Sequence, residues 1–563
     1  ISTFENNSLH IHHLGVNDGL PDVMITSLAK DHEGNIYAGG YQNGFCVIDS
    51  KSLEILWRLG SDYDPGPVSG ILPGKRYTWI TTEIEGLIRI DNKSGHFQNF
   101  RQIQGQSLQR LQGIFRGREG NIWCWRGENH FQIPGEEFSF VYTGKTNKLS
   151  DVHALLIDDE GYLWYASEYG LFRHRQIFSG KEYAEKINIP ASISSRDITC
   201  LYQDVTGYIW IGTFGSGLYR LNPDAKGGKW YREQDGLINN NILAISEGMQ
   251  EIWFATLGGA SKYLIPQNPE HRGQFINFDE EQGLGNNFIY DVLVDDEQNI
   301  WFATDGTGIT LLENGSFTNF GPDQGLMSEK VYVLTTDKQN RLWCATHDNN
   351  IYFYEKGLFH EIPLIPDPNT TISALEVDEL NNLLIVQENG LSIYNINTDN
   401  VTHFSSQAGI SPIDPEFNST AVSTDGAIWV GTENGLIKYT PVSNNLIQHP
   451  QVVITEVSVF LQPVKSLYKS EFSYNENHFT FNYIGLWYHN PERVSYQVML
   501  EGNDLEWKPT ADRQISYTNL SPGNYTFKVR ASQYKDFLGT KAASYSFKIN
   551  APFWSTWWFY AIV

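Results

Sequence analysis

Five aspartates recur at one position of a repeated sequence phrase, and carboxylates are common general acids and bases. They are Asp31, Asp158, Asp204, Asp296 and Asp337. A reaction needs its acid once, so fivefold recurrence favours a structural turn in which the aspartate accepts backbone N–H groups. The chain has no G-x-S-x-G, H-E-x-x-H or phosphate-loop motif. We therefore expect a non-catalytic protein.

Residues that could hold a metal or form disulfides are few. His10, His12 and His13 lie close together, but no carboxylate or third ligand is near them in sequence. We expect no metal and no other cofactor. The four cysteines each lie in an apolar run and form no C-x-x-C pair: Cys46, Cys124, Cys200 and Cys344. We expect all four to be buried and reduced.

The composition indicates many short strands joined by turns. Aromatic residues make up 14% of the 563 residues, charged residues only 19%, and there are 50 glycines. The net charge of −25 argues against binding to nucleic acid or to an anionic membrane surface. No run of about 18 apolar residues is present. Residues 551–563, rich in Trp, resemble the start of a membrane span.

A phrase consisting of an apolar run, an Asp-x-x-Gly-like turn, an aromatic anchor and a Gly-Leu pair recurs about every 40–45 residues. Its ten anchors are Tyr37, Trp79, Trp123, Trp164, Trp210, Trp253, Trp301, Trp343, Leu384 and Trp429. In the fifth repeat, residues 198–203, 208–213, 218–221 and 229–232 each suit a strand. The pattern predicts an all-β fold, with a β-propeller of ten four-stranded blades over residues 1–440.

The N-terminal segment suggests how the ring would close. Residues 9–13 resemble the fourth strand of a blade that has no blade before it. We expect them to pair beside residues 436–439 and to seal a single ring of ten blades. Two five-bladed rings remain an alternative. A seven-plus-three split is disfavoured, because three blades could not close.

Ligand-binding residues are sought where repeats depart from their own pattern. The loops between the second and third strands, and those joining successive blades, share one ring face. On it we expect Arg126, Phe214, Asn240, Asn287 and His347, together with Arg196 and Lys330. Amides, guanidinium groups and aromatic rings suit the hydroxyls and apolar faces of neutral sugars.

A second pattern begins after a linker at residues 441–450. Residues 451–550 show short alternating strands typical of an immunoglobulin-like β-sandwich. Tyr496, Tyr517 and Tyr525 occur in it around Trp507 and the Leu-Ser-Pro-Gly run at 520–523.

The two patterns together resemble a known family. The ten repeats resemble the regulator-type propeller repeats of bacterial two-component sensors, and the three tyrosines resemble the triple-tyrosine (Y_Y_Y) domain that follows them. The 552–558 segment is similar to the exit from that domain into a transmembrane helix. The resemblance implies a periplasmic ectodomain of an inner-membrane sensor of the Bacteroidetes type, such as a hybrid kinase. Better-known members resemble paired seven-bladed rings, so their ligand geometry does not transfer to ten repeats.

The function expected from this resemblance is sensing of a small ligand, an oligosaccharide. The sandwich would pass the signal to a membrane helix and mediate a parallel homodimer next to the membrane. Two rival functions remain. Sialidase propellers also carry repeated aspartate turns, although no arginine triad is identifiable here, so a glycan-cleaving or lyase-like enzyme is one alternative. A protein-binding scaffold is the other.

Overall fold

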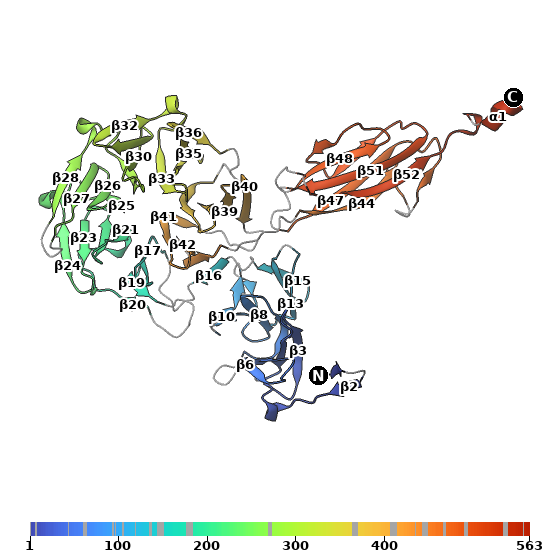
Figure 1. The fold of residues 1–563 in the computed structure, drawn as a ribbon, viewed down its shortest axis with the longest axis horizontal. Helices are drawn as coiled ribbons and strands as arrows, with labels where there is room; N and C mark the ends of the chain where they lie inside the picture. Colours follow the sequence, from blue (N-terminus) through green and yellow to red (C-terminus); the bar gives the residue numbers. More distant parts are fainter. Residues whose placement is uncertain are drawn as a thin grey trace. The chain divides into compact units, whose positions relative to one another are not determined.

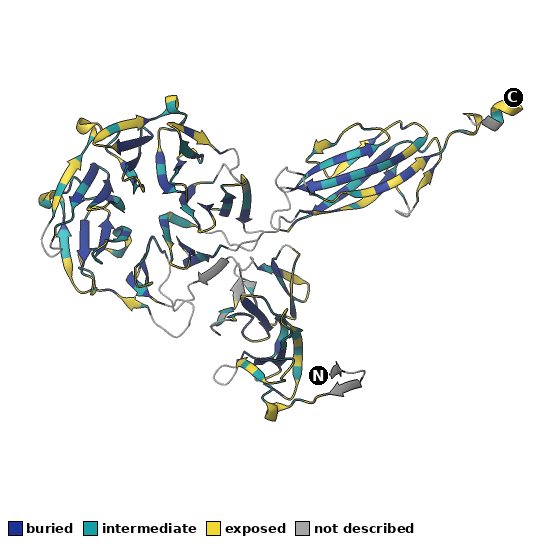
Figure 2. Ribbon diagram, in the orientation of Figure 1, coloured by how far each residue is buried: buried dark blue, intermediate teal, exposed yellow. Residues whose placement is uncertain are grey.

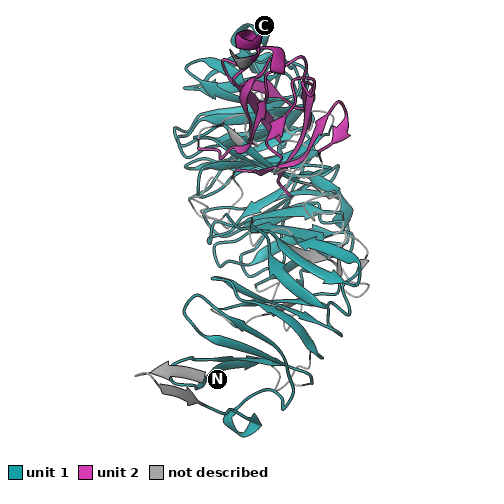
Figure 3. Cartoon of the chain, turned by 90° about the vertical axis from the view of Figure 1, so that its right-hand side faces the viewer, with its two compact units in different colours: residues 1–443 teal, residues 444–563 magenta. Residues whose placement is uncertain are grey.

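The structure, a computed structural model, divides into two compact units, residues 1–443 and 444–563 (Figure 3). Both are built from β-sheets joined by turns and short helical segments. The described residues are 2–5, 8–42, 44–59, 65–92, 95, 97–103, 106–118, 120–133, 138–142, 151–175, 184–267, 273–362, 370–405, 414–433, 435–441, 449–464, 469–488, 494–532, 537, 539–555 and 557–563.

Seven of the ten predicted repeats form a closed ring of four-stranded blades, hereafter the ring (Figure 1). We number the blades by repeat, so that the ring contains blades 4 to 10. Blades 4 to 6 comprise β17 (Ala154–Ile157), β18 (Leu163–Ser167), β19 (Gly170–His174), β20 (Glu185–Lys186); β21 (Ile198–Gln203), β22 (Ile209–Thr213), β23 (Gly217–Leu221), β24 (Gly228–Tyr231); and β25 (Ile242–Glu247), β26 (Glu251–Thr256), β27 (Gly259–Leu264), β28 (Gln274–Phe278). Blades 7 to 9 comprise β29 (Ile289–Val294), β30 (Ile300–Thr304), β31 (Ile309–Glu313), β32 (Ser316–Phe320); β33 (Val331–Thr336), β34 (Leu342–Thr346), β35 (Ile351–Glu355), β36 (Leu358–Glu361); and β37 (Ile372–Val377), β38 (Asn382–Gln387), β39 (Gly390–Asn395), β40 (Asn400–Ser405). Blade 10 comprises β41 (Pro415–Val422), β42 (Ile428–Thr432), β43 (Gly435–Tyr439) and β16 (Phe138–Tyr142).

Apolar side chains packed between neighbouring blades hold the ring together. Each of the seven blade-to-blade junctions has its own buried cluster, and the last joins blade 10 to blade 4 through Trp429, Leu436 and Tyr165. The second strand of a typical blade is buried on both faces, which explains its continuous apolar sequence (Figure 2). The first strands of successive blades contact one another around the ring. Blades 4 to 10 thus form seven junctions that close on themselves.

The predicted ring closure is wrong. Strand β16 pairs antiparallel with β43, with Phe138 opposite Tyr439 and Tyr142 opposite Gly435. Residues 8–11 instead form β2 (Ser8–Ile11), which pairs with β1 (Ser2–Glu5) in a hairpin. A chain segment before the first ring blade therefore supplies the outer strand of the last. Neither a ten-bladed ring nor two five-bladed rings form. The repeats divide into seven and three, the split that the sequence disfavoured, because the three N-terminal blades do not need to close into a ring of their own.

The first three repeats form a separate row of blades, hereafter the N-terminal array. Its strands are β3 (Ile25–Lys30), β4 (Ile36–Gly40), β5 (Phe45–Ile48), β6 (Ile55–Leu59); β7 (Val68–Leu72), β8 (Tyr77–Thr82), β9 (Leu87–Asp91), β10 (Phe97–Phe100); and β13 (Gly113–Arg116), β14 (Ile122–Arg126), β15 (Asn129–Ile133). A small hairpin, β11 (Gln102–Ile103) with β12 (Gln106–Ser107), precedes blade 3. Buried clusters join blade 1 to blade 2 and blade 2 to blade 3.

The repeated aspartates form the predicted structural turns. Asp204 is typical: Oδ1 accepts the backbone N–H groups of Thr206 and Tyr208 at 3.0 and 3.1 Å, and Oδ2 accepts the indole N–H of Trp210 at 2.8 Å. The same aspartate-to-indole bond joins Asp158 to Trp164, Asp295 to Trp301 and Asp337 to Trp343. The assignment of Asp296 to this position is off by one residue. Asp295 carries the turn, and the Asp296 side chain is exposed.

The second unit is a β-sandwich of two sheets. One has the order β45-β44-β47-β50 and the other β46-β52-β51-β48-β49. Their bounds are β44 (Gln451–Val459), β45 (Gln462–Pro463), β46 (Glu471–Phe472), β47 (Phe479–Leu486), β48 (Ser495–Glu501), β49 (Lys508–Thr510), β50 (Gln514–Tyr517), β51 (Gly523–Ser532) and β52 (Ala543–Ile549). Most of the predicted linker, residues 441–450, lies outside the described residues.

The three family-motif tyrosines are buried in the core of this sandwich. Each satisfies its hydroxyl locally, as a buried phenol requires. Tyr496 accepts the backbone N–H of Gly485 at 2.9 Å, Tyr517 donates to Asp504 at 2.8 Å, and Tyr525 donates to the carbonyl of Ser521 at 2.7 Å. The last bond runs four residues back along the chain, like the tyrosine corner of immunoglobulin-type sandwiches. These tyrosines hold the sandwich together.

The C-terminal segment forms a short 3-10 turn (Phe553–Ser555) and the helix α1 (Trp557–Ile562). The ring of Trp554 packs edge-on against Tyr474 of the sandwich, with centroids 4.9 Å apart. Over the part of the chain that the structure describes, no helix has the length and apolar character needed to cross a membrane.

We expect the four cysteines to resist thiol reagents in the folded protein. All are free, three are buried, and burial raises the pKa of Cys46 to about 11 and of Cys124 and Cys200 to about 12. The thiolate fraction at pH 8 is therefore very small. Titration with a chromogenic disulfide should release no rapid signal from native protein and four equivalents from protein unfolded in guanidinium. Fast labelling of the native chain would contradict this expectation.

Candidate functional site

A widened bulge in β41 brings blade 10 into contact with blades across the ring. Opposite β42, Pro415 pairs with Thr432 and Thr420 pairs with Val430, so β41 carries three extra residues, five steps against two. The equivalent bulges in blades 5 to 9 contain one extra residue. Asn418, at the bulge, has a positive φ of 51°. The bulge projects Phe417 and Asn418 away from the sheet ladder.

The exposed end of this bulge belongs to a group of aromatic side chains, the ring-face cluster. Its members are Tyr290, Tyr332, His347 and Phe417, with the charged pair Asp305 and Lys330. Tyr332 is central: its ring lies edge-on to Tyr290 at 4.6 Å, to His347 at 5.7 Å and to Phe417 at 5.9 Å. The cluster therefore joins blades 7, 8 and 10.

Hydrogen bonds and an ion pair also connect the members of the ring-face cluster. The hydroxyl of Tyr332 lies 3.2 Å from Nδ1 of His347. Asp305 accepts the hydroxyl of Tyr290 at 3.2 Å and pairs with the ammonium of Lys330 at 2.8 Å. Burial and the Asp305 charge raise the pKa of Tyr290 to about 12, so its phenol remains protonated. Asp305 likewise raises the pKa of Lys330.

Part of the cluster is open to solvent. The Phe417 side chain is 42% exposed, and Phe288, which precedes β29, is 50% exposed. Both Tyr290 and Tyr332 are half-buried, and His347 and Lys330 are exposed. The ring thus offers aromatic surface bordered by a cation, a carboxylate and an imidazole. Such a surface can stack on an apolar sugar face and hydrogen-bond hydroxyl groups.

Two carboxyl groups, those of Asp291 and Glu376, contact the bulged strand β41. Asp291 accepts the backbone N–H groups of Val292 and Leu334, both at 2.9 Å, and the side chain of Asn418 also donates to it. Glu376 accepts the hydroxyl of Thr420 at 3.2 Å. Loss of hydration raises the pKa of both carboxyls to about 7. Each carboxyl thus accepts a hydrogen bond from a side chain of the bulged strand.

The stability of the ring should fall as pH rises from 5 to 7. A carboxyl whose pKa is raised in the folded state binds more protons there than when unfolded, so the stabilisation is lost as pH rises through the folded pKa. The slope is at most about 1.4 kcal/mol per pH unit for each carboxyl. Urea unfolding at pH 5, 6 and 7 should therefore show a flatter dependence for Asp291→Asn than for the unchanged chain. Equal slopes would contradict this assignment.

The structure brings together only two of the seven predicted ligand residues. Lys330 and His347 meet in the ring-face cluster, where the backbone N–H of His347 donates to the backbone carbonyl of Lys330 at 3.0 Å. Phe214 is 55% exposed after β22, on another blade of the same ring. Arg196 pairs with Glu168 at 2.9 Å. Whether these residues touch a ligand remains a prediction.

The other three predicted residues make hydrogen bonds within the chain. Arg126 belongs to the N-terminal array and donates to the carbonyl of Ser107 at 3.0 Å. Asn240 and Asn287 brace blade connections, because each exchanges two bonds with a glutamate seven residues earlier, Glu233 and Glu280 respectively. In each asparagine the side-chain Oδ1 accepts the glutamate backbone N–H, and the backbone N–H donates to the glutamate carboxylate.

Sequence reasoning missed Tyr290, Tyr332, Asp305 and Phe417. Tyr290 and Tyr332 each occupy the second position of the first strand of a blade. Aligning the repeats on their anchors places these two tyrosines at the same position, so the sequence contained a signal for them. Asp305 had a similar signal, because it directly follows Thr304, the threonine that recurs at the end of the second strand of the blades. Phe417 had no such signal, because the three-residue enlargement of the bulge is not visible in a single repeat.

Both units of the chain contain segments that match known protein families. The two-component regulator propeller family matches residues 192–215 and 283–306, which are the first two strands of blades 5 and 7, and the Y_Y_Y domain family matches residues 488–550. Histidine kinase P4 of Formosa agariphila is 22% identical over 387 residues, which are 63% of this chain. The chain spans only 28% of that relative.

A solved structure shares the fold. The extracellular domain of the hybrid two-component system BT3049 from B. thetaiotaomicron superposes with a TM-score of 0.66 at 20% identity, covering 97% of this chain and 74% of that one. The predicted all-β architecture, with propeller blades followed by an immunoglobulin-like sandwich, is confirmed. In this chain, matches to the two-component regulator propeller family precede a match to the Y_Y_Y domain family.

Proposed function

We propose that this chain is the extracytoplasmic sensing part of a membrane-bound two-component regulator and that its ring binds an oligosaccharide. The architecture supports the sensor role, because regulator propeller repeats and a Y_Y_Y domain occur in one chain. The observation that carries the ligand class is the ring-face cluster, in which exposed Phe417 occurs together with Lys330, Asp305 and His347. A sugar ring would stack on Phe417, and its hydroxyls would bond the polar groups.

Binding without cleavage is favoured over a glycan-cleaving activity. A glycosidase needs one carboxylic acid and one free carboxylate flanking the bond. Asp305 already pairs with Lys330 and accepts the phenol of Tyr290. The repeated aspartates of the turns are committed to backbone and indole N–H groups. The cluster therefore suits recognition.

The test is calorimetric titration of the purified chain with a panel of oligosaccharides, with mass spectrometry of the mixture. We expect saturable binding and no products. Phe417→Ala should weaken binding by roughly 1–2 kcal/mol, about 5- to 30-fold. Leu358→Ala is the control, since this exposed side chain lies on the outer strand β36. Products would instead indicate an enzyme, and equal affinities of the two variants would remove the site.

In the full-length protein, the sandwich would pass the ligand-induced change to a membrane helix within a parallel homodimer. Ligand can shift such an equilibrium only if it binds the two arrangements unequally. Single cysteines placed between Ala551 and Ser555 of the full-length protein should cross-link, to an extent that changes with the oligosaccharide. No cross-link in either condition would rule out the dimer at this segment.

A further inference from the structure

Blade 1 lacks the side chains that fill the space beside the turn in other blades. In blade 5 the anchor Trp210 lies under the guanidinium of Arg220, the residue opposite it on the third strand, at 5.2 Å. Blade 2 repeats the arrangement with Trp79 and Arg89. In blade 1 the same two positions hold Tyr37 and Val47. Two large side chains are thus replaced by smaller ones.

Blade 9 shows how such a loss can be compensated by the next blade. Its anchor position holds Leu384, opposite Ile393. There Tyr439 of blade 10 fills the gap, and its hydroxyl donates to Asp378, the turn aspartate of blade 9, at 3.0 Å. The equivalent position in blade 2 is Ile90, since Tyr439 pairs with Ile428 as Ile90 pairs with Thr78. Ile90 has no hydroxyl and is too short to replace the missing groups.

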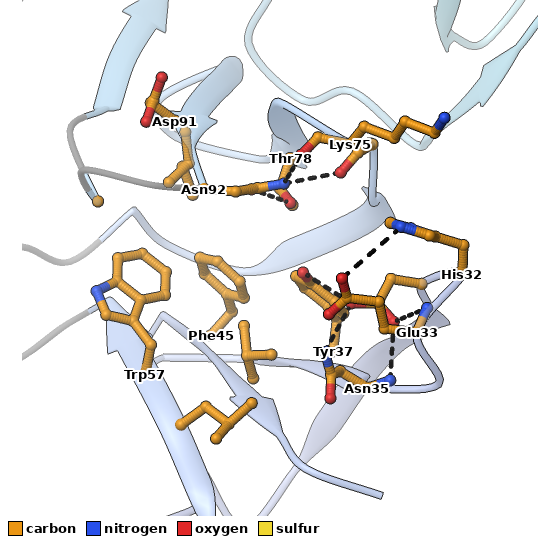
Figure 4. Close-up of a pocket in the computed structure, with 16 residues that line it drawn as sticks. His32, Glu33, Asn35, Tyr37, Phe45, Trp57, Lys75, Thr78, Asp91 and Asn92 are labelled. Atoms are coloured by element: carbon orange, nitrogen blue, oxygen red, sulfur yellow. Dashed lines mark hydrogen bonds and ion pairs between the residues drawn. The ribbon is translucent and has the colours of Figure 1, made fainter.

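A cavity of about 450 Å³ therefore opens between blades 1 and 2 (Figure 4). One wall is aromatic and apolar: the rings of Phe45 and Trp57 lie edge-on with centroids 5.2 Å apart, above Val47. The facing wall carries Lys75 and Asn92, as Figure 4 shows. The volume lies within the range of small-molecule sites.

The polar groups are held in place before any ligand arrives. Asn92 accepts the hydroxyl of Thr78 at 2.7 Å and donates to the carbonyl of Gly74 at 2.7 Å. The hydroxyl of Tyr37 reaches Asp31 only at 3.4 Å, a long bond compared with the indole bonds of other blades. Burial raises the pKa of Tyr37, so this hydroxyl remains a donor. Such fixed groups reduce the entropy lost on binding.

We propose that this inter-blade pocket binds a single neutral pyranose sugar. The apolar C–H face of the sugar would lie against Trp57. Its hydroxyls would donate to the second lone pair of the Asn92 Oδ1 and to the Tyr37 phenol oxygen, and would accept from the Lys75 ammonium. Hydroxyls both donate and accept, which matches a wall that contains an ammonium group, amides and the nearby carboxylates of Glu33 and Asp91. The site uses other blades than the ring-face cluster and does not depend on it.

The test uses Val47→Arg, which restores the residue of blades 2 and 5 and fills the pocket instead of emptying the core. The whole chain is titrated with D-glucose, D-galactose, D-mannose and N-acetyl-D-glucosamine, with saturation-transfer NMR and tryptophan fluorescence as readouts. We expect at least one sugar to bind with millimolar affinity. Val47→Arg and Trp57→Ala should each weaken it at least tenfold, while Val47→Arg keeps the wild-type urea unfolding midpoint.

Three outcomes would overturn the proposal. They are no saturable binding of any of the four sugars, binding unchanged by Val47→Arg, and binding lost in Phe417→Ala but kept in Val47→Arg. The last would place the monosaccharide on the ring face. Oligosaccharide binding by the ring should survive Val47→Arg, so failure of one proposal is distinguishable from failure of the other.

Discussion

Replacing Asp204 with alanine should lower the free energy of unfolding of the ring by about 3–5 kcal/mol. The Asp204 side chain is fully buried, and Arg220, whose side chain is only 2% exposed, pairs with it at 3.0 Å. Its removal leaves a guanidinium charge buried in blade 5 without its counter-ion. It also leaves the indole N–H of Trp210 and two backbone N–H groups of the turn without their hydrogen-bond acceptor. The penalty for an unpaired buried charge dominates the effect.

The matched control is Asp296→Ala, a change of the same type in the corresponding turn of blade 7, where the side chain is exposed. Urea unfolding followed by tryptophan fluorescence should place this variant within about 0.5 kcal/mol of the unchanged chain. Asp295→Ala should fall between the two, because Asp295 accepts an indole bond but has no buried arginine beside it in blade 7, where Leu311 stands opposite the anchor. Similar losses at Asp204 and Asp296 would refute this account.

Deleting residues 138–142 should open the ring. These residues form β16, which completes blade 10 by pairing with β43 over five residue pairs. Removing the strand exposes the edge of β43 and abolishes about four or five ladder hydrogen bonds, a loss of roughly 4–5 kcal/mol at about 1 kcal/mol each. Exposed strand edges also promote association. We therefore expect a lower unfolding midpoint and concentration-dependent aggregation in light scattering.

Deletion of residues 8–11 provides the control, because the sequence assigned ring closure to this region and the structure places it in the β1–β2 hairpin. The unfolding transition of the ring should not change. If this deletion destabilised the ring while deletion of 138–142 did not, the observed pairing would be wrong. The two deletions differ by one residue in length, so chain shortening alone does not explain a difference.

The blades could be predicted from the sequence because each is specified locally. The turn aspartate, the anchor and the Gly-Leu pair occur within about 25 residues, and the strand alternation between them needs no distant partner. The closure of the ring could not be predicted in this way. Residues 9–13 and 138–142 both resemble an outer strand, and the choice depends on the junction of Trp429 and Leu436 with blade 4, formed by residues far apart in the chain.

In the candidate site, too, locally specified residues could be predicted and contacts between distant residues could not. Lys330 and His347 could be chosen because they follow or precede strands at repeated positions. The bonds of Asn240 and Asn287 to Glu233 and Glu280 could not be read from the repeat alignment, which does not relate these residues to one another. Phe417 reaches Tyr332 only because of the enlarged bulge. That contact depends on tertiary geometry, which a repeat alignment does not contain.

The closing strand also affects the order in which the protein can fold during synthesis. Strand β16 ends at Tyr142 and its partner begins at Gly435, a separation of 293 residues (435 − 142). At about 5–20 residues per second, the ribosome needs roughly 15–60 s to deliver the partner. Blades 4 to 9 can form during this interval, whereas β16 must wait. A second chain that offers a finished β43 could capture it, so a strand-swapped dimer is the characteristic misfolded product we expect of this ring.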